Sequence, residues 1–350
     1  MTPSLHHSPS NAPPTAPGRG GPRAAHGRRR RFLRLTGVLA GALAAALVVS
    51  TGTNLVLERV EQASVTPYGH RVAIDGGALN VVQNGRAGRP LVLLSGLGTA
   101  APGLDFAPLT RELNDFNVTV VEGFGYGYSD MSAGPRTVDS IATELHAALA
   151  TLGIAKPYTL VGHSIAGFYT LYYANKYPDE VSAVIGIDTT VPSATVPSAT
   201  VPSATAGSVE PSVGGVNWER MLSTTGVVRG LDTLVPALAE PAGDAFTAGE
   251  RERIRLMSSW NFGNTALSDE TRRMGDNARA IQGMSYPADL PVLIFLSAES
   301  LGSLPHWREL HEEQVRNVTR HELIELPGGH YLHWTQSPAM AAAIREFLGS

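Results

Sequence analysis

The chain has 350 residues, a formal net charge of −4 and no cysteine. It therefore forms no disulfide, uses no thiolate nucleophile and binds no metal through sulfur. A slightly acidic chain with no basic stripe beyond residue 34 is not expected to bind nucleic acid. Its length accommodates one large domain with a smaller additional unit.

The N-terminal region predicts a membrane anchor. Residues 1–34 are rich in proline, glycine and arginine, and we expect a disordered basic tail there. Residues 35–57 carry no charged side chain and are long enough to cross a bilayer as a helix. Because the arginines before this helix would stay in the cytoplasm, the rest of the chain would lie outside it. Residues 29–34 also resemble a twin-arginine export signal, so export after signal cleavage is the alternative.

Apolar runs and a helical pattern alternate over the next part of the chain. One amphipathic helix is predicted at residues 138–152, where leucine and isoleucine recur on one face. Four buried strands are predicted around it, at residues 90–94, 117–121, 158–161 and 181–187. Such alternation is typical of a mostly parallel sheet covered by helices on both faces.

The strand at 158–161 leads into Gly162-His163-Ser164-Ile165-Ala166, which has the form of a nucleophile elbow. A serine on such a sharp strand-to-helix turn needs small residues two positions before and after it, because a larger side chain would meet the neighbouring backbone. Gly162 and Ala166 satisfy this requirement. Ser164 is therefore the candidate nucleophile.

Residues 189–288 do not continue the sheet pattern. They begin with three copies of Val-Pro-Ser-Ala-Thr at 191–205, which we expect to form a flexible tether, because a short repeat with proline in every copy cannot build a core. Helical patterns follow at residues 218–222, 234–238, 250–260 and 269–281. We expect these helices to form a cap, whose apolar side chains either pack as its core or roof a substrate pocket.

The C-terminal part returns to the sheet pattern, with strands predicted at 291–296 and 323–326 and a helix at 339–348. The last strand is followed by Pro327-Gly328-Gly329-His330, a glycine turn that would deliver His330 to the sheet edge that carries Ser164. A serine hydroxyl needs such a base, because it is a poor nucleophile at neutral pH. His330 is the candidate base, and His333 is the alternative.

The alternating strands and helices, the Ser164 elbow and the late His330 together resemble the α/β-hydrolases. The resemblance implies an α/β fold with a mostly parallel sheet, helices on both faces and a helical cap inserted after the sixth strand. It extends over residues 66–350. These divide into a first core segment at 66–188, the tether and cap at 189–288, and a second core segment at 289–350.

Two positions are open for the carboxylate that orients the base. The usual place in the family follows the strand at 291–296, where this chain has Ser297-Ala298-Glu299 in place of an aspartate after a glycine. The other is Asp188, at the end of the strand at 181–187. A branch of the related haloalkane dehalogenases is similar in both places, because its acid follows the earlier strand and its later strand ends in Asn-Ala-Glu. We favour Asp188, with Glu299 as the alternative acid.

The oxyanion hole is expected to consist of the backbone N–H groups of Leu97, in a small-residue loop after the strand at 90–94, and Ile165, directly after the nucleophile. In this fold a serine at the elbow implies an acyl-enzyme. We therefore expect a serine hydrolase that cleaves carboxylic esters or related acyl bonds of apolar small molecules, without cofactor or metal. The alternatives are cofactor-free haloperoxidase-like or lyase-like chemistry, and a catalytically silent member that serves as a binding module.

Overall fold

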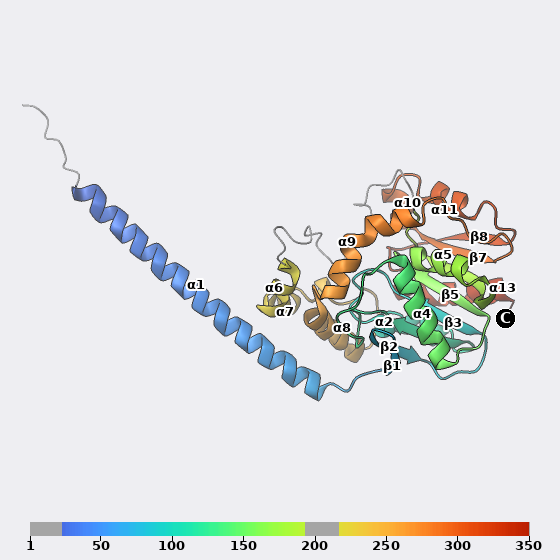
Figure 1. The fold of residues 1–350 in the computed structure, drawn as a ribbon, viewed down its shortest axis with the longest axis horizontal. Coiled ribbons are helices and arrows are strands. Elements are labelled where there is room, and N and C mark those ends of the chain that lie inside the picture. Colours follow the sequence, from blue (N-terminus) through green and yellow to red (C-terminus); the bar gives the residue numbers. More distant parts are fainter. Residues whose placement is uncertain (1–22, 193–216, 350) are drawn as a thin grey trace, which may run out of the picture. The chain divides into compact units, whose positions relative to one another are not determined.

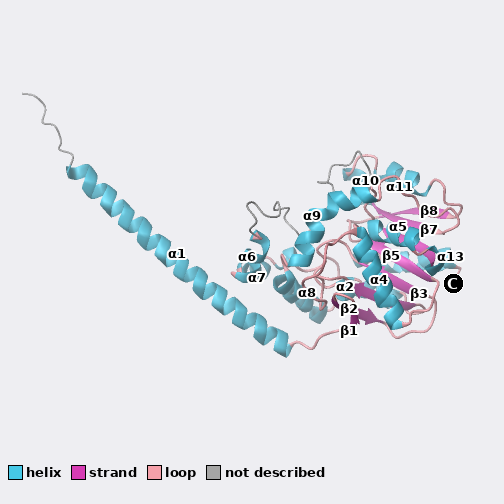
Figure 2. Cartoon of the chain, in the orientation of Figure 1, coloured by secondary structure: helices cyan, strands magenta, loops and turns pink. Residues whose placement is uncertain are grey.

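The computed structural model describes residues 23–192 and 217–349. The chain divides into two compact units, residues 1–50 and residues 51–350. The first unit contains the N-terminal part of helix α1 (Arg23–Ser64), and the second contains the last turns of α1 and the remaining elements. Figures 1 and 2 show α1 and the packed α/β part of the chain.

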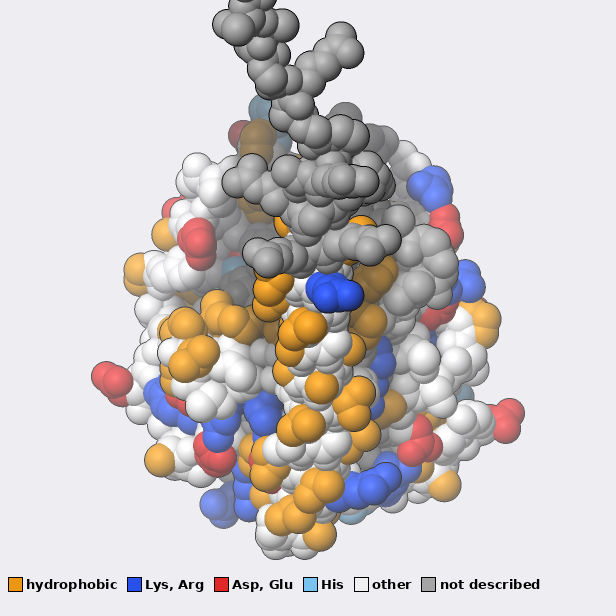
Figure 3. Space-filling view, turned by 90° about the vertical axis from the view of Figure 1, so that its left-hand side faces the viewer, with side chains coloured by type: hydrophobic (Ala, Val, Ile, Leu, Met, Phe, Trp, Pro, Cys, Tyr) orange, Lys and Arg blue, Asp and Glu red, His pale blue; other side chains and the backbone are white. Residues whose placement is uncertain are grey.

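Helix α1 is longer than the predicted span at 35–57. It begins at Arg23, inside the segment expected to be a disordered tail, because alanine, arginine and leucine all favour helix and extend it in both directions. Its part from Phe32 to Ser64 reaches a mean hydropathy of 2.1, and the apolar window is not buried by protein. Figure 3 shows apolar side chains along its length. By length and composition this helix can cross a membrane.

Within the described residues the sheet has eight strands in the order β1-β2-β4-β3-β5-β6-β7-β8. The pairs β1–β2 and β2–β4 are antiparallel and the other pairs are parallel. The strands are β1 (His70–Ile74), β2 (Gly77–Gln83), β3 (Pro90–Leu94), β4 (Asn117–Glu122), β5 (Tyr158–His163), β6 (Val181–Ile187), β7 (Val292–Ser297) and β8 (His321–Leu326). The sequence patterns predict β3 to β8 but miss the hairpin β1–β2, because these strands are only partly buried and lack a continuous apolar run.

Side chains of the central strands alternate between two apolar layers. Leu91 and Leu93 face one layer, and Val92 and Leu94 face the other. The first is covered by α3 (Ala107–Glu112), α12 (Leu332–Thr335) and α13 (Ser337–Leu348), and the second by α4 (Val138–Leu152), α5 (Ala166–Lys176) and α11 (Trp307–Val315). The remaining core helices are short: α2 (Pro102–Asp105), η1 (Pro178–Glu180) and α10 (Ala298–Ser303). This is the two-sided sheet that the sequence predicts.

The cap lies between β6 and β7, as expected. It consists of α6 (Trp218–Thr224), α7 (Val227–Leu234), η3 (Pro236–Leu238), α8 (Ala248–Asn261) and α9 (Thr265–Ala280). The predicted helix at 234–238 is wrong in its bounds: α7 ends at Leu234 and only one 3₁₀ turn follows, because Pro236 has no N–H to continue an α-helix. The Val-Pro-Ser-Ala-Thr tether lies, from residue 193 onward, outside the described residues.

Hydrogen bonds at the start of the cap helices fix them on the core. Thr247 and Glu250 form a capping box at the start of α8, and the Asn264 side chain caps α9. The Asn264 amide also donates to the carbonyl of Gly125, and the Asn261 amide to that of Gly127, both in the turn after β4 and both at 2.8 Å. These side chains therefore hold α8 and α9 over the carboxyl ends of the parallel strands.

Candidate active site

Ser164 lies on a strained turn between β5 and α5. Its φ of 56° is in the left-handed region, which costs a non-glycine residue free energy and is maintained only by the surrounding structure. Its N–H donates to the Ile187 carbonyl at 3.1 Å, and its carbonyl accepts from the Thr190 N–H at 2.8 Å. A Cβ on Gly162 would lie 3.0 Å from the Thr170 methyl group, so the turn needs glycine there. This geometry is that of the nucleophile elbow.

His330 follows β8 on the expected glycine turn, in which Gly328 has a φ of 128°. The His330 ring is 5% exposed, and its Nδ1 donates to Asp188 Oδ2 at 2.7 Å. With Nδ1 protonated, Nε2 of the neutral ring carries the lone pair that a general base needs. The structure thus joins two residues that are 142 positions apart in the sequence.

Asp188 is fully buried, and its carboxylate accepts five hydrogen bonds. Besides His330, the donors are the Ser297 N–H at 3.1 Å, the Ser297 hydroxyl at 2.9 Å, the Ser300 hydroxyl at 2.6 Å and the Trp307 indole N–H at 3.0 Å. Burial alone would raise the pKa of Asp188, but the hydrogen bonds, with His330 foremost, hold that pKa below its ordinary value. Asp188 is therefore held as a carboxylate next to the histidine.

Glu299 contacts the same histidine at its backbone. Its Oε2 accepts the His330 N–H at 3.2 Å, and its own N–H donates to the Gly328 carbonyl at 3.2 Å. The side chain is exposed, at the first turn of α10. The structure therefore places Glu299 on the glycine turn that carries His330 and places Asp188 on the imidazole ring.

The alternative base, His333, has another carboxylate as its partner. Its Nε2 is 2.7 Å from Asp105 Oδ2, and it is fully buried. His163 packs between the two other imidazoles, with ring centroids 4.7 Å from His330 and 4.6 Å from His333. Burial, and then the neighbouring His333 and His330, hold the pKa of His163 well below its ordinary value. His163 is thus a neutral packing residue behind the elbow.

The loop after β3 lies against the nucleophile. A Cβ on Gly96 would be 3.1 Å from Ser164 Cβ and 2.9 Å from His163 Nδ1, so only glycine permits this approach. Leu97 follows Gly96 in this loop. Ile165 is buried and immediately precedes α5, where unpaired N–H groups and the helix dipole favour a negative charge. Of the two residues proposed for the oxyanion hole, Ile165 directly follows Ser164, and Leu97 directly follows the glycine that approaches it.

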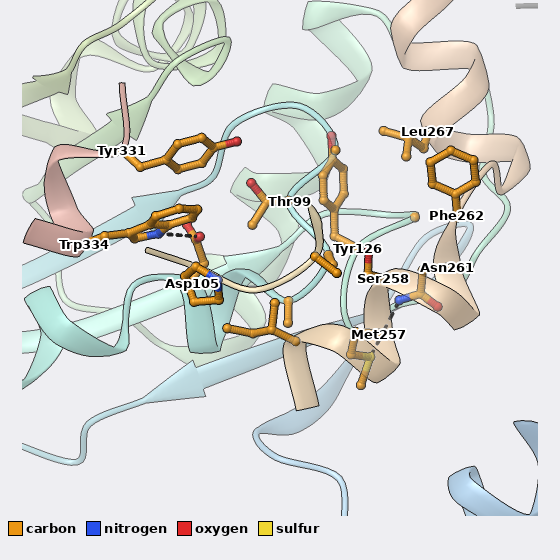
Figure 4. Close-up of a pocket in the computed structure, with 17 residues that line it drawn as sticks. Thr99, Asp105, Tyr126, Met257, Ser258, Asn261, Phe262, Leu267, Tyr331 and Trp334 are labelled. Carbon is orange, nitrogen blue, oxygen red and sulfur yellow. Dashed lines mark hydrogen bonds between the residues drawn. The ribbon is translucent and has the colours of Figure 1, made fainter. Parts of the chain in front are cut away.

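A mainly apolar pocket lies between this loop and the cap. Figure 4 shows Tyr331 and Trp334 on one side of it and Asn261, Phe262 and Leu267 on the other. Its polar groups include Asp105, which accepts the Trp334 indole N–H at 2.8 Å. The lining described by the structure reaches Gly98, Thr99 and Tyr331 but not Ser164 or His330, which are 3% and 5% exposed. The pocket is thus lined by Tyr331, the neighbour of His330 in the chain, and not by the candidate triad itself.

A buried polar network joins the cap to the core beside this pocket. Glu270, on α9, accepts the Tyr169 hydroxyl of α5 at 2.5 Å. Burial raises the pKa of Glu270. The positive charge of Arg136 and the hydrogen bonds that Glu270 accepts from Tyr169 and Tyr126 oppose this rise. Arg136 is itself buried and donates to Glu144 at 2.6 Å. This network does not include Asp188 or His330.

Within the described residues, no group of three or more histidine, aspartate or glutamate side chains is arranged to hold a metal ion.

Sequence reasoning missed the donors around Asp188. Ser297 and Ser300 flank Glu299 in the sequence. Ser297 ends a predicted strand and Ser300 follows three residues later, and this spacing of two hydroxyl groups is a signal that could have indicated them. Trp307 comes from α11, and no local pattern links it to Asp188. Its contact exists only because α11 packs beside the ends of β6 and β7.

A comparison of the sequence with models of known protein families agrees with the elbow, the sheet order and the cap position. The model described as "alpha/beta hydrolase fold" matches residues 89–215, which include Ser164 and Asp188. The chain has the α/β-hydrolase fold, and its residues 89–215 match the model of that family. This fold carries its cap after the sixth strand.

Individual relatives agree with a hydrolase. An uncharacterized protein of Bacillus subtilis, YbdG, is 27% identical over 82% of this chain and 88% of its own length. Lipase 1 of Psychrobacter immobilis is 29% identical over 41% of this chain, and the match spans 45% of that lipase. Among solved structures, a putative epoxide hydrolase from Pseudomonas aeruginosa has a TM-score of 0.63 over 80% of this chain and 94% of its own, at 18% identity, which shows a common fold.

Proposed function

We propose that this α/β-hydrolase cleaves carboxylic esters through an acyl-enzyme on Ser164. The observation that carries the proposal is the His330–Asp188 pair, 2.7 Å apart and buried, at the same sheet edge as a serine on a strained elbow. A serine, rather than an aspartate, at the elbow favours acyl transfer over the alkyl-enzyme chemistry of epoxide hydrolases and dehalogenases.

Each residue has one role in the proposed reaction. The Ser164 hydroxyl attacks the ester carbonyl while His330 Nε2 accepts its proton, and Asp188 stabilises the resulting imidazolium. The N–H groups of Leu97 and Ile165 bind the oxyanion of the tetrahedral intermediate. His330 then returns the proton to the leaving alcohol. A water molecule, deprotonated by His330, attacks the acyl-Ser164 ester, and His330 returns the proton to the Ser164 oxygen as the carboxylic acid leaves.

The test uses the full chain in detergent with a chain-length series of p-nitrophenyl esters and a fluorophosphonate label. We expect turnover and labelling of the wild type, and Ser164→Ala should lose both, with turnover falling by about four orders of magnitude or more. Ser182→Ala, an exposed serine on β6, is the control and should behave like the wild type. A wild type that neither turns over any ester nor takes the label would overturn the proposal and favour a silent binding module.

We further propose that α1 retains the protein in the membrane with the catalytic domain outside the cytoplasm. The support is the apolar part of α1 from Phe32 onward, which has sufficient length and hydropathy and follows a run of arginines in the sequence. Protease added to intact cells should then remove the catalytic domain. Mature protein that begins after residue 57 would indicate a cleaved export signal instead.

A further inference from the structure

Exposed apolar side chains are concentrated in one part of the cap. Apart from α1, the strongly exposed large apolar side chains of the described residues all lie between residues 218 and 238, on α6, α7 and η3. Leu234 is the most exposed of them, at 81%. We call this set the cap face: Trp218, Met221, Val227, Leu231, Leu234, Val235 and Leu238. Since α6 and α7 pack against each other, these side chains gather on neighbouring helices, which is typical of an interaction site.

The charged side chains of α7 do not interrupt the cap face. Arg229 Nη1 donates to Glu61 of α1 at 2.6 Å, and Asp232 is 6% exposed. Arg220, on α6, donates to the Trp260 carbonyl at 2.9 Å. With these groups turned toward other parts of the cap and α1, the spacing of Val227, Leu231 and Leu234 leaves one apolar side of α7 outward.

The cap is attached to the end of the apolar helix. Asn54 is 3% exposed, donates to the Ser223 carbonyl of α6 at 3.1 Å and accepts from Arg229 Nε at 2.7 Å. Glu61 accepts the Trp260 indole N–H of α8 at 2.9 Å. Asn54 belongs to the uncharged run at 35–57, and a helix rises about 1.5 Å per residue. The chain therefore meets α6 and α7 within a few ångströms of the end of this run.

We propose that the cap face rests in the lipid surface of the membrane that α1 enters. The inference depends on α1 crossing that membrane. The attachment at Asn54 then keeps α6 and α7 at the bilayer boundary, where lipid removes the exposed leucine and valine side chains from water. A tryptophan such as Trp218 suits this boundary, since its ring is apolar and its N–H is polar. The partner is the bilayer itself, not a second protein.

The cap face continues into the pocket, which indicates the substrate class. Leu238 is 48% exposed on the cap face, and the next residue, Ala239, is buried and lines the pocket. Met257 and Ile254 of α8 line it from the neighbouring helix. Resting on the proposed function, we infer that the substrates are esters held in the bilayer, which reach the pocket past η3 without crossing water.

The first experiment detects lipid contact without relying on hydrolysis. The full chain is reconstituted in phosphatidylcholine vesicles with and without bromine on the acyl chains. The tryptophan fluorescence of Trp218→Phe is subtracted from that of the wild type, and the difference is the contribution of Trp218. We expect brominated lipid to quench this difference by half or more. Leu234→Asp should abolish most of the quenching, and Thr233→Asp should not, since it adds the same charge at an exposed neighbouring position of α7 outside the apolar spacing.

Unquenched Trp218 fluorescence, or equal quenching in the two aspartate variants, would overturn the proposal. If Trp218 is unquenched and photobleaching counts two chains per particle, the cap face belongs to a second copy instead.

The second experiment measures hydrolysis in unbrominated vesicles, with a bilayer-soluble ester and with water-soluble p-nitrophenyl acetate. Leu234→Asp should slow hydrolysis of the bilayer-held ester at least fivefold and leave hydrolysis of the acetate unchanged. Thr233→Asp should change neither rate. Equal slowing of both esters would overturn the inferred route. Quenching of Trp218 without hydrolysis of either ester by the wild type would support the lipid contact and overturn the proposed function, so the two failures are distinguishable.

Discussion

The sheet edge that carries Ser164 and the cap face differ in where their contacts are made. At the sheet edge, Asp188 in the loop after β6 is wholly buried, and its five hydrogen bonds come from β7, α10, α11 and the turn after β8. On the cap face, the large apolar side chains are 40–81% exposed, with Leu234 the most exposed. The first region is completed by the fold itself, and the second is completed, on our proposal, by lipid.

The inner side of the same cap behaves like the sheet edge. Asn261 and Asn264 bond to the turn after β4, and Glu270 bonds to Tyr169 of α5. Polar groups with fixed directions hold α8 and α9 on the core, whereas α6 and α7 are held through Asn54 and Glu61 of α1. The cap is thus built between two supports, the core on one side and the end of the apolar helix on the other.

The largest effect is expected from breaking the network at the sheet edge. Asp188→Asn leaves a side chain of the same shape but removes the negative charge that stabilises the imidazolium and selects the tautomer of His330. We expect kcat for p-nitrophenyl esters to fall about ten-thousandfold. The measurement is steady-state turnover with the fold checked by circular dichroism. A fall of less than tenfold would contradict the assignment of Asp188.

Asp188 should also contribute to stability in a defined pH range. Because the pKa of Asp188 is lower in the folded protein, its stabilising effect is complete above the unfolded value of 3.8 and is lost as the pH falls through the lower folded pKa. The melting temperature of the wild type should therefore fall as the pH is lowered below about pH 4, and that of Asp188→Asn should fall less steeply. Parallel melting profiles of the two proteins would contradict this.

An intermediate effect is expected from breaking the attachment of the cap to α1. Asn54→Ala leaves the Ser223 carbonyl and the Arg229 guanidinium without their buried partner, which should destabilise α6 and α7 locally by about 1–3 kcal/mol. Amide hydrogen exchange of residues 218–234 should accelerate, while that of β5 and α5 stays unchanged. Gln62→Ala is the control, because in the part of the chain that the structure describes the Gln62 amide donates only to Glu58 of the same helix. Equal exchange in both variants would contradict the role of Asn54.

The smallest effect is expected at Glu299. Glu299→Gln keeps an oxygen that accepts the His330 N–H and should reduce kcat by less than about tenfold, the range of a single hydrogen bond. Glu299→Ala removes this acceptor and should reduce kcat further than Gln. The comparison with Asp188→Asn separates the two carboxylates. If Glu299→Gln lost as much activity as Asp188→Asn, Glu299 would be the acid.

Much of the fold could be predicted from local patterns. Most of the parallel strands β3 to β7 are apolar runs, because both faces of such a sheet are buried, and the predictions of β3 to β8 are confirmed. The edge strand β8 contains both apolar and charged residues and is only partly buried. The hairpin β1–β2 was missed, since its strands are short and partly exposed. The helix predicted at 234–238 was misplaced, because Pro236 cannot continue an α-helix and only a 3₁₀ turn forms there.

The sequence by itself determined the positions where chemistry is expected. Gly162, Ser164 and Ala166 predict an elbow because a sharp turn excludes larger side chains, and the glycine turn before His330 has a similar steric reason. These requirements act between residues close in the chain, so they are visible without a structure. The same holds for the uncharged run at 35–57.

Only the tertiary structure decided which carboxylate meets the His330 ring. Asp188 and Glu299 stand at the ends of adjacent parallel strands, and sequence reasoning could rank them only by resemblance. The choice depends on side-chain directions at two loop ends and on donors such as Trp307 that come from another helix. The exposure of the cap face was likewise undetermined, because the apolar residues of α6 and α7 have the same pattern whether they pack inward or point outward.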